Sequence, residues 1–563
     1  MLIYRDFRSE ILKALHSAIA ELDEKDLSLD RTGHGDYALK GFRYARGGNF
    51  EEFCEKVRGI LLREEYIESV SCEVPYINIT IRPESMFTSM DEILTTRSKY
   101  PDTFQEPDRV LIEHTSTNPT GPIHVGRSRN SIIGDSLYRL FRRAGYRTST
   151  QYFVNDSGKQ VMAMVVGNRL FSGGRRDVAA ILEGYQKVYR EMEGNTAIEE
   201  KIQELMRKYE EGDEQVIGEV RDICSITLEG IKKSLRDIDI VVDDYVFESS
   251  FLTGGQVQEI IEKLGEHVKR DTTSSTEESK NTNDRDALYL EVPGGKKVYL
   301  QRSDGTSLYF LRDLAYHNFK AQTSDWIIDV LGEDHKDHGK SLSYVLKEFL
   351  DYPAKIDFVF YAFVSLEAGK MSTRKGTAVS LDDLIERAYE EAYRVVKDKR
   401  KDLKEDQLRK IARSVGISSI RFNIVRIHPD KRLVFRWSDA LNFEGDSAPY
   451  IMYSYARASS ILRKVPDAIS SHAENFNTEE RNLVKTLYLY PHYLSESLSS
   501  LRPDIMANYA LDLVKRFSDF YSKHSVLKAP KEEMGKRISL IRMYRAILAD
   551  VCDILGIRLL DEM

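Results

Sequence analysis

What is scarce in this chain of 563 residues already excludes several kinds of protein. There are only four cysteines, and none forms a Cys-x-x-Cys pair, so the sequence predicts neither a zinc site nor a disulfide framework. Sparse cysteine use of this kind is typical of a reducing compartment. There is no run of about 20 apolar residues, so no segment is expected to span a membrane. No internal repeat is evident.

Positive charge is not in excess either. The chain has 82 Lys and Arg against 90 Asp and Glu, a net charge of −8, which argues against a uniformly basic coat for binding nucleic acid. Charged residues follow Met1 closely, so no signal peptide is expected and the predicted location is cytoplasmic. The length predicts more than one domain and a large core.

The stretch from residue 109 to residue 127 is the most informative part of the chain. Its apolar run Val110-Leu111-Ile112 predicts a buried strand, and a polar turn rich in proline and glycine follows. Apolar residues then recur at a helical period as far as Ala144. His124 and Gly126 therefore lie where a strand ends and a helix begins. Free backbone N–H groups and the helix dipole favour an anion at such a place.

Gly126 has no Cβ, so a flat base or a phosphate can approach its backbone closely, and His124 and Arg127 add side-chain donors. The alternative is an ordinary strand-to-helix turn with a surface histidine, because a lone His-x-Gly is a weak signal. A second motif bears on this choice. Residues 358–364 predict another buried strand, which leads into a cationic loop at 369–376 that can close over a triphosphate. By itself that loop is equally well explained as a basic surface loop.

Together the two motifs carry a family resemblance. Residues 118–126 resemble the HIGH signature of class I aminoacyl-tRNA synthetases, and residues 369–376 resemble the KMSKS signature of that family. The two stand in the family's order, each at the end of a predicted strand. Two positions depart from the pattern: Arg127 replaces the usual second histidine, and Thr373 replaces the usual second lysine. We predict that Lys370 or Lys375 supplies the missing charge.

Further motifs are similar to those of the arginyl-tRNA synthetases, and the resemblance covers the whole chain. They are the loop 35–38, the pair Tyr309 and Asp313, and the segments 443–450 and 453–457. The resemblance implies a multidomain α/β protein with a Rossmann-like parallel-sheet catalytic core, an N-terminal α+β domain and a C-terminal all-α anticodon-binding domain. The expected boundaries are 1–105 for the N-terminal domain, 106–385 for the catalytic domain with 170–290 largely an insertion, 386–440 for a basic helical connection and 441–563 for the anticodon-binding domain.

The chemistry of the implied substrate agrees with the residues present. A guanidinium is planar and always charged, and it calls for carboxylates in a fixed arrangement. Asp313 and Glu113 can supply carboxylates, and Tyr309 a hydroxyl or an aromatic face. The resemblance implies that Ser116 and Asn118 position the backbone of the amino acid. The residues expected to bind arginine are Glu113, Ser116, Asn118, His124, Tyr309, Asp313 and Asp334.

The resemblance also implies two chemical steps: ATP activates arginine as arginyl-adenylate, and tRNA then accepts it. Activation is expected only with tRNA bound. Mg²⁺ would accompany ATP, held by phosphates and water, so no protein cage for a metal is expected. The expected catalytic residues are His124, Gly126, Arg127, Lys370 and Lys375. The residues expected to bind ATP are Thr120, Gly121, His124, Gly126, Arg127, Gly332, Glu333, His335, Val364, Lys370, Met371 and Ser372.

Contacts with the cognate tRNA are expected at both ends of the chain. The segment 391–440 has 14 Lys and Arg against 7 Asp and Glu, which suits a phosphate backbone, although a solvated helix pair is the alternative. In the N-terminal domain, Tyr37 either contacts tRNA or packs inward. The residues expected to bind tRNA are Tyr37, Arg409, Lys410, Arg413 and Tyr453. A monomer is expected.

Two rival interpretations remain at this stage. One is another class I synthetase, such as the cysteinyl enzyme, which the lack of clustered cysteines disfavours. The other is a catalytically inactive RNA-binding relative, which the presence of His124, Gly126 and Lys370 disfavours.

Overall fold

The structure is a computed structural model, and it describes residues 5–17, 19, 21–30, 33–45, 49–95, 108–192, 196–271, 286–366, 379–465 and 474–563. Its centre is a five-stranded sheet in the order β12-β11-β5-β6-β7, and every neighbouring pair is parallel. This confirms the predicted parallel sheet. The strands are β5 (Arg109–Glu113), β6 (Arg147–Val154), β7 (Asp244–Phe247), β11 (Trp326–Gly332) and β12 (Lys355–Tyr361).

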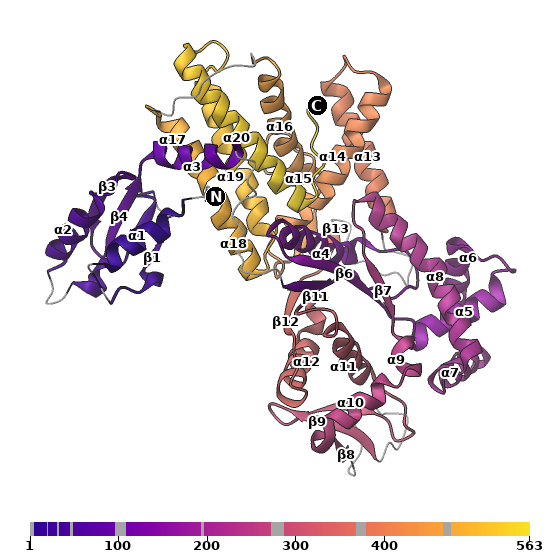
Figure 1. The fold of residues 1–563 in the computed structure, drawn as a ribbon. Helices are drawn as coiled ribbons and strands as arrows, with labels where there is room; N and C mark the ends of the chain where they lie inside the picture. Colours follow the sequence, from indigo (N-terminus) through magenta and orange to yellow (C-terminus); the bar gives the residue numbers. More distant parts are fainter. Residues whose placement is uncertain are drawn as a thin grey trace.

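Both faces of this sheet are buried, as expected of parallel strands. Val110 and Ile112 of β5 belong to the large core shared with α4 (Val125–Arg143), whereas Leu111 packs with Ile327 on the opposite face. Figure 1 shows the central sheet at the middle of the molecule, with further helices around it. Helices α11 (Tyr309–Lys320) and α12 (Lys336–Phe349) also lie next to the sheet, whereas α5 (Gly158–Phe171) packs on helices of the insertion.

The predicted insertion forms two structures that extend from the sheet (Figure 1). Two of its helices are α7 (Thr196–Glu210) and α8 (Glu214–Asp237), and residues 272–285 lie outside the described residues. The remaining elements are α6 (Val178–Met192), α9 (Ser249–Thr253), α10 (Gln256–Leu264) and a three-stranded sheet of β8 (Lys269–Asp271), β9 (Ala287–Val292) and β10 (Lys296–Gln301).

One predicted strand differs from the structure. The strand predicted over 358–364 is broken at residues 362–363. Its last part, β13 (Val364–Leu366), pairs instead with β14 (Leu433–Phe435), which lies after the connecting helices. Pairing with a distant partner is a tertiary effect that a local apolar run does not reveal.

The N-terminal domain has the expected α+β character. Its antiparallel sheet has the order β1-β2-β4-β3, from β1 (Leu27–Leu29), β2 (Tyr37–Leu39), β3 (Ile67–Glu73) and β4 (Tyr76–Ile81), and its helices are α1 (Phe7–His16), α2 (Phe50–Leu61) and α3 (Pro83–Thr95). The prediction of no disulfide is wrong here: Cys54 of α2 is bonded to Cys72 of β3. Packing α2 on the sheet brings together two cysteines 18 positions apart, with their Cα atoms 6.2 Å from each other.

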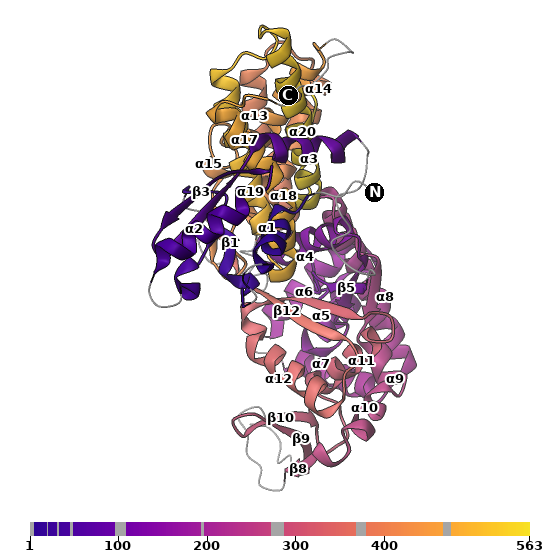
Figure 2. The same cartoon turned by 60° about the vertical axis from the view of Figure 1, so that its left-hand side comes forward.

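The C-terminal part is helical, as predicted. Figures 1 and 2 both show the N-terminal domain lying beside these helices. Lys485 of α17 forms an ion pair of 2.9 Å with Asp36, and Arg481 one of 2.8 Å with Glu68. The helices are α13 (Leu381–Lys399), α14 (Glu405–Val425), α15 (Trp437–Ala440), α16 (Ala448–Leu462), α17 (Thr478–Tyr488), α18 (Tyr490–Ser500), α19 (Asp504–Lys523) and α20 (Lys531–Leu555).

Candidate active site

The predicted strand-to-helix turn is present, and His124 is the N-cap residue directly before α4. The preceding and following residues are fixed to the start of α13: Val125 N–H donates to the Val379 carbonyl at 3.0 Å, and Leu381 N–H donates to that of Ile123 at 2.7 Å. Burial, with a smaller effect of Arg127, lowers the pKa of His124 to about 4. His124 is therefore a neutral imidazole at neutral pH, next to the first free N–H groups of α4.

Gly126 has a steric role different from the one predicted. A Cβ at this position would lie 3.0 Å from Cε1 and 3.1 Å from Nδ1 of His124, and 3.4 Å from the Val364 carbonyl. The missing side chain therefore leaves room for the His124 ring. Val364, one of the residues predicted to bind ATP, is thus brought to the start of α4. Thr120 and Gly121 lie in the turn before the helix, and Gly121 has a φ of 152°.

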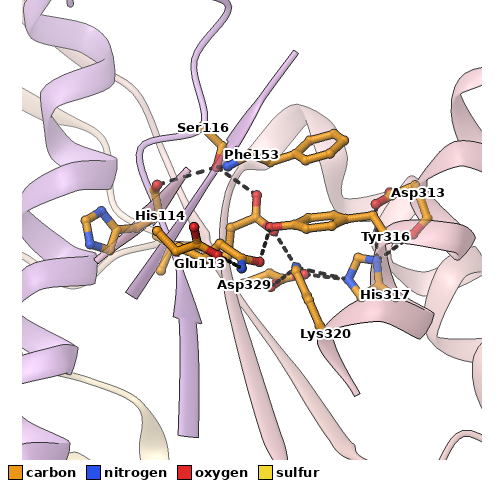
Figure 3. Close-up of polar contacts among 12 residues, drawn as sticks. Glu113, His114, Ser116, Phe153, Asp313, Tyr316, His317, Lys320 and Asp329 are labelled. Carbon is orange, nitrogen blue, oxygen red and sulfur yellow. Dashed lines mark hydrogen bonds and ion pairs between the residues drawn. The ribbon is translucent and has the colours of Figure 1, made fainter. Parts of the chain in front are cut away.

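On the other face of the sheet, α11 directs one row of polar side chains at three neighbouring strands. Asp313, Tyr316, His317 and Lys320 have the spacing of one helix face. They face Asp329 of β11, Glu113 of β5 and Gln151 of β6, which are consecutive partners in the sheet register. Tyr316 donates to Gln151 at 2.7 Å, and its ring stacks on Phe153 at 4.1 Å. Figure 3 shows this arrangement.

Within this row, cations and carboxylates alternate (Figure 3). Lys320, wholly buried, pairs with Glu113 and with Asp329 Oδ1, the latter at 2.8 Å. His317 Nε2 lies 2.7 Å from Asp329 Oδ2, and its Nδ1 lies 3.2 Å from Asp313 Oδ1. His338 Nε2 approaches the other oxygen of Asp313, at 2.6 Å. We call the series Glu113, Lys320, Asp329, His317 and Asp313 the buried charge chain.

The protonation states follow from this pairing. Burial alone would raise the pKa of Asp313, but His317 and His338 outweigh it and hold the pKa below its ordinary value. Burial and Lys320 oppose a charge on His317, yet Asp329 and Asp313 raise its pKa to about 9. Burial raises the pKa of Glu113, an effect that Lys320 opposes. Asp313 is thus the carboxylate of the chain whose ionised form its neighbours favour most clearly.

The structure gives Glu113 a different task from the predicted one. Its carboxylate is already paired with Lys320, and Ser116 Oγ donates to its Oε1 at 2.7 Å. Ser116 in turn accepts from Phe153 N–H at 3.0 Å and has a φ of 25°. Glu113 is therefore positioned to hold the turn at Ser116, while Asp313 is the member of the chain nearest the predicted aromatic, Tyr309, which is 41% exposed.

Sequence reasoning missed a further carboxylate. Glu248 follows the last residue of β7, is completely buried, and lies with its Oε1 3.1 Å from Nε of Arg312, the neighbour of Asp313. Burial raises the pKa of Glu248, an effect that Arg312 opposes. The position at the carboxyl end of a parallel strand was the available signal. The prediction that residues 170–290 are largely an insertion did not include this strand, although β7 belongs to the central sheet.

The other predicted ligands lie near the same edge of the sheet. Asn118 is exposed and donates to Gln160 at 3.4 Å. Gly332 ends β11, and the short helical turn of Glu333, Asp334 and His335 follows. The predicted residues Lys370, Met371, Ser372 and Lys375 lie outside the described residues.

The residues predicted to bind tRNA differ in how exposed they are. Of the two alternatives for Tyr37, the structure shows inward packing, which argues against the predicted tRNA contact: this side chain is 4% exposed, because β2 pairs with β4 and turns it into the domain core. Arg409 and Arg413 are exposed, but they pair with Glu405 and Asp237 respectively. Lys410, between them on α14, is exposed.

Tyr453, by contrast, lies at the mouth of a cavity of about 400 Å³ in the C-terminal helices. It is 43% exposed, and the Arg457 guanidinium lies 4.8 Å from its ring and 5.1 Å from that of Tyr521. An exposed aromatic pair with a cation between them suits a nucleobase.

The described residues contain no group of three or more His, Cys, Asp or Glu side chains placed to hold a metal ion. Among the helices that the structure describes, none is long and apolar enough to cross a bilayer.

Comparison with protein families gives two matches. The model for "tRNA synthetases class I (R), catalytic domain" matches residues 89–437, and the "DALR anticodon binding domain" matches residues 451–563. The chain is 44% identical over 565 residues to the arginine–tRNA ligase of Thermoplasma acidophilum, covering 100% of both. It is 37% identical to that of Archaeoglobus fulgidus, covering 99% of both.

Solved structures agree. The arginyl-tRNA synthetase of Thermus thermophilus superposes with a TM-score of 0.84 at 25% identity, covering 100% of both chains. The enzyme from Plasmodium falciparum gives a TM-score of 0.81 at 18% identity, which shows the shared fold. With a family model over residues 89–437 and a full-length relative at 44% identity, this chain belongs to the class I arginyl-tRNA synthetases.

Proposed function

We propose that this protein activates L-arginine with ATP and transfers it to the 3′-terminal adenosine of its tRNA. The observation that carries the proposal is Asp313, a buried carboxylate held ionised at the edge of the parallel sheet where ligands bind. It lies beside Tyr309, which starts α11 and is exposed. An ionised carboxylate and an aromatic face are groups that suit a guanidinium.

The arginine carboxylate attacks the α-phosphorus of ATP in the first step. A bond forms between carboxylate oxygen and phosphorus, and the bond to the bridging oxygen breaks, releasing pyrophosphate. A ribose hydroxyl of the tRNA then attacks the acyl carbon, and AMP leaves. No side chain needs to become covalently bonded, so the protein acts through position and charge.

At the ATP end, His124 and the first N–H groups of α4 are placed to donate to phosphate oxygens, and Arg127 adds a fixed positive charge. We propose that Mg²⁺ comes with the nucleotide and is held largely by its phosphates and by water. The neutral state of His124 lets it donate without repelling Mg²⁺.

For arginine, Glu248 is proposed as a second carboxylate beside Asp313, because it ends a neighbouring strand and is buried with Arg312 next to Asp313. Ser116, fixed by Glu113, and the exposed Asn118 are proposed to hold the amino-acid backbone.

For tRNA, we propose that Tyr453, Arg457 and Tyr521 stack on an exposed base of the anticodon loop. Tyr453→Ala should weaken tRNA binding by about 1–3 kcal/mol, the usual contribution of one stacked base, whereas Tyr453→Phe keeps the ring and should bind normally. Equal loss in both variants, or in neither, would count against stacking.

In the N-terminal domain, we propose that the exposed aromatics Phe42 and Tyr76 make the tRNA contact first considered for Tyr37.

The test of the proposed reaction is ATP–pyrophosphate exchange across the twenty amino acids, with and without cognate tRNA. Among the twenty amino acids, we expect only arginine to give exchange above background. Even arginine should do so only when tRNA is present. The Asp313→Asn variant is the control for the assigned pocket, and it should lose the arginine signal. Exchange with another amino acid, or an undiminished signal in Asp313→Asn, would contradict the assignment.

A further inference from the structure

His317 has an unusual environment for a buried histidine, because both of its ring nitrogens face acceptors (Figure 3). Nε2 lies 2.7 Å from Asp329 Oδ2. Nδ1 lies 2.8 Å from the backbone carbonyl of Asp313 and 3.2 Å from Oδ1 of the same residue. A neutral imidazole has a proton on one nitrogen only, and would turn a lone pair toward one of these oxygens. The geometry therefore calls for the doubly protonated, charged ring.

The groups around His317 come from four elements. Asp313 and Lys320 share its helix, and the Lys320 ammonium lies 3.4 Å from Nε2. From outside α11, the facing groups are Asp329 of β11, Glu113 of β5 and His338 of α12. The His317 ring is only 2% exposed, so solvent contributes little to balancing these charges. Lys320 opposes the charge on the ring, and the two aspartates favour it.

We propose that His317 is a positioning residue that sets substrate specificity: its charged ring keeps Asp313 ionised, so that the site selects the guanidinium of arginine over the neutral ureido group of citrulline. This inference rests on the proposed function, because it takes Asp313 as the residue that binds the arginine side chain. His317 itself lies behind Asp313 and acts through it.

The selection follows from hydrogen-bond chemistry. An ionised carboxylate only accepts hydrogen bonds, and a guanidinium only donates them, so the pair is fully matched. Citrulline has the same shape, but a carbonyl oxygen replaces one N–H₂ group of the guanidinium. If Asp313 is ionised, the carbonyl oxygen of citrulline faces a carboxylate oxygen, and neither atom has a proton to donate. A protonated Asp313, in contrast, would donate to it and lose its attraction for a cation.

Burial favours that protonated form. Without His317, burial would act to raise the pKa of Asp313, and of the two histidines that now lower it only His338 would remain. A buried carboxyl that titrates near neutral pH would make arginine binding depend on pH and would admit citrulline as the pH falls.

The first experiment compares His317→Gln with the parent enzyme, in the presence of tRNA. We expect the parent KM for arginine to be constant from about pH 6 to pH 8, and that of the variant to rise about tenfold per pH unit below the new pKa. Citrulline should inhibit arginine activation in the variant, more strongly at the lower pH, and should not inhibit the parent. His267→Gln is the matched control, since His267 stacks on Phe349 away from the charge chain.

A merely structural role would raise KM equally at every pH and leave citrulline excluded, and that result would overturn the proposal. A second variant, Asp329→Asn, covers the case in which His317→Gln does not fold. It removes the carboxylate at Nε2 while leaving His317 in place, and should produce the same pH dependence and the same admission of citrulline. A flat pH profile with citrulline still excluded would again overturn the proposal.

A third measurement needs no destabilised variant. ¹⁵N NMR of the histidine-labelled parent enzyme at neutral pH should show both nitrogens of His317 protonated, and a neutral tautomer would contradict the proposed role of His317.

Failure of this inference can be distinguished from failure of the proposed function. If Asp313→Asn loses arginine while the His317 results are negative, only the role of His317 is wrong. If Asp313→Asn keeps its arginine KM, the site itself has been misplaced.

Discussion

The protein has two clusters of buried charged side chains, and both pair carboxylates with cations. The two clusters nevertheless have different functions. One is the buried charge chain that ends at Asp313. The other, which we call the interdomain cluster, consists of Asp135 and Arg139 of α4 and Arg421 of α14. Asp135 and Arg421 are both almost fully buried, at 3% and 0% exposure of their side chains.

The interdomain cluster is closed. Arg421 pairs with Asp135 and also donates to the carbonyls of Ile238 at 2.8 Å and Leu555 at 3.1 Å. Arg139 donates to Asp135 at 2.7 Å, and together with Arg421 it lowers the pKa of Asp135 although burial would raise it. The partners thus come from the catalytic sheet region, the insertion and the last helix. This cluster fixes the anticodon-binding domain to the helix that follows His124.

The buried charge chain is open at one end. Its last carboxylate, Asp313, has 12% of its side chain exposed and lies beside Tyr309. The comparison teaches that burying charge does not by itself mark a binding site. A closed set of partners stabilises a junction between domains, whereas an open set leaves one charge for a ligand.

The largest expected effect comes from breaking the closed cluster. Arg421→Met leaves Asp135 buried without its main partner, and should lower the free energy of unfolding by about 3–5 kcal/mol. A shift of the denaturation midpoint measures this change. The double variant Asp135→Asn/Arg421→Met removes both charges and should recover much of the loss. If the single variant is as stable as the parent, the cluster does not hold the domains together.

The next effect is expected at the other end of α4. Gly126→Ala places a Cβ about 3 Å from the His124 ring and should displace the ring. The rate of adenylate formation should fall by about 10²-fold, while the interdomain cluster stays intact. Single-turnover adenylate formation with tRNA present measures the rate. Gly59→Ala on α2 is the matched control, because its Cβ would meet no atom within 4 Å. A parental rate in Gly126→Ala would remove His124 from the ATP site.

The smallest effect is expected on the outer part of α14. Neutralising Arg409, Lys410 and Arg413 together should weaken tRNA binding and reduce its dependence on salt by about one unit of slope per lost phosphate contact. Binding measured over a range of salt concentrations provides the slope. Arg409 and Arg413 already pair with Glu405 and Asp237. An unchanged slope would therefore mean that these cations of α14 interact only with solvent and with neighbouring side chains.

Local sequence predicted those parts of the fold that short-range patterns determine. The apolar run before Glu113 became a parallel strand, His124 became the N-cap residue of α4, and Tyr309 and Asp313 came to one helix face. Each follows from periodicity or from the end of an element.

What could not be predicted depends on which elements meet. Lys320 neutralises Glu113 only because α11 packs over that point of the sheet register. Tyr37 is buried because β2 pairs with β4, and Cys54 bonds to Cys72 because α2 packs against β3. These contacts join residues far apart in sequence, and one sequence contains no signal of such pairing.

The most direct test of the central claim measures the two clusters with one kind of change. Asp313→Asn and Asp135→Asn each remove one carboxylate charge at nearly constant size, and the two variants are compared for the KM of arginine and for the denaturation midpoint. The account predicts that Asp313→Asn raises the arginine KM by at least about 10²-fold, whereas Asp135→Asn lowers the midpoint and leaves the KM of the folded enzyme unchanged. A parental arginine KM in Asp313→Asn, or an equally large KM increase in Asp135→Asn, would contradict it.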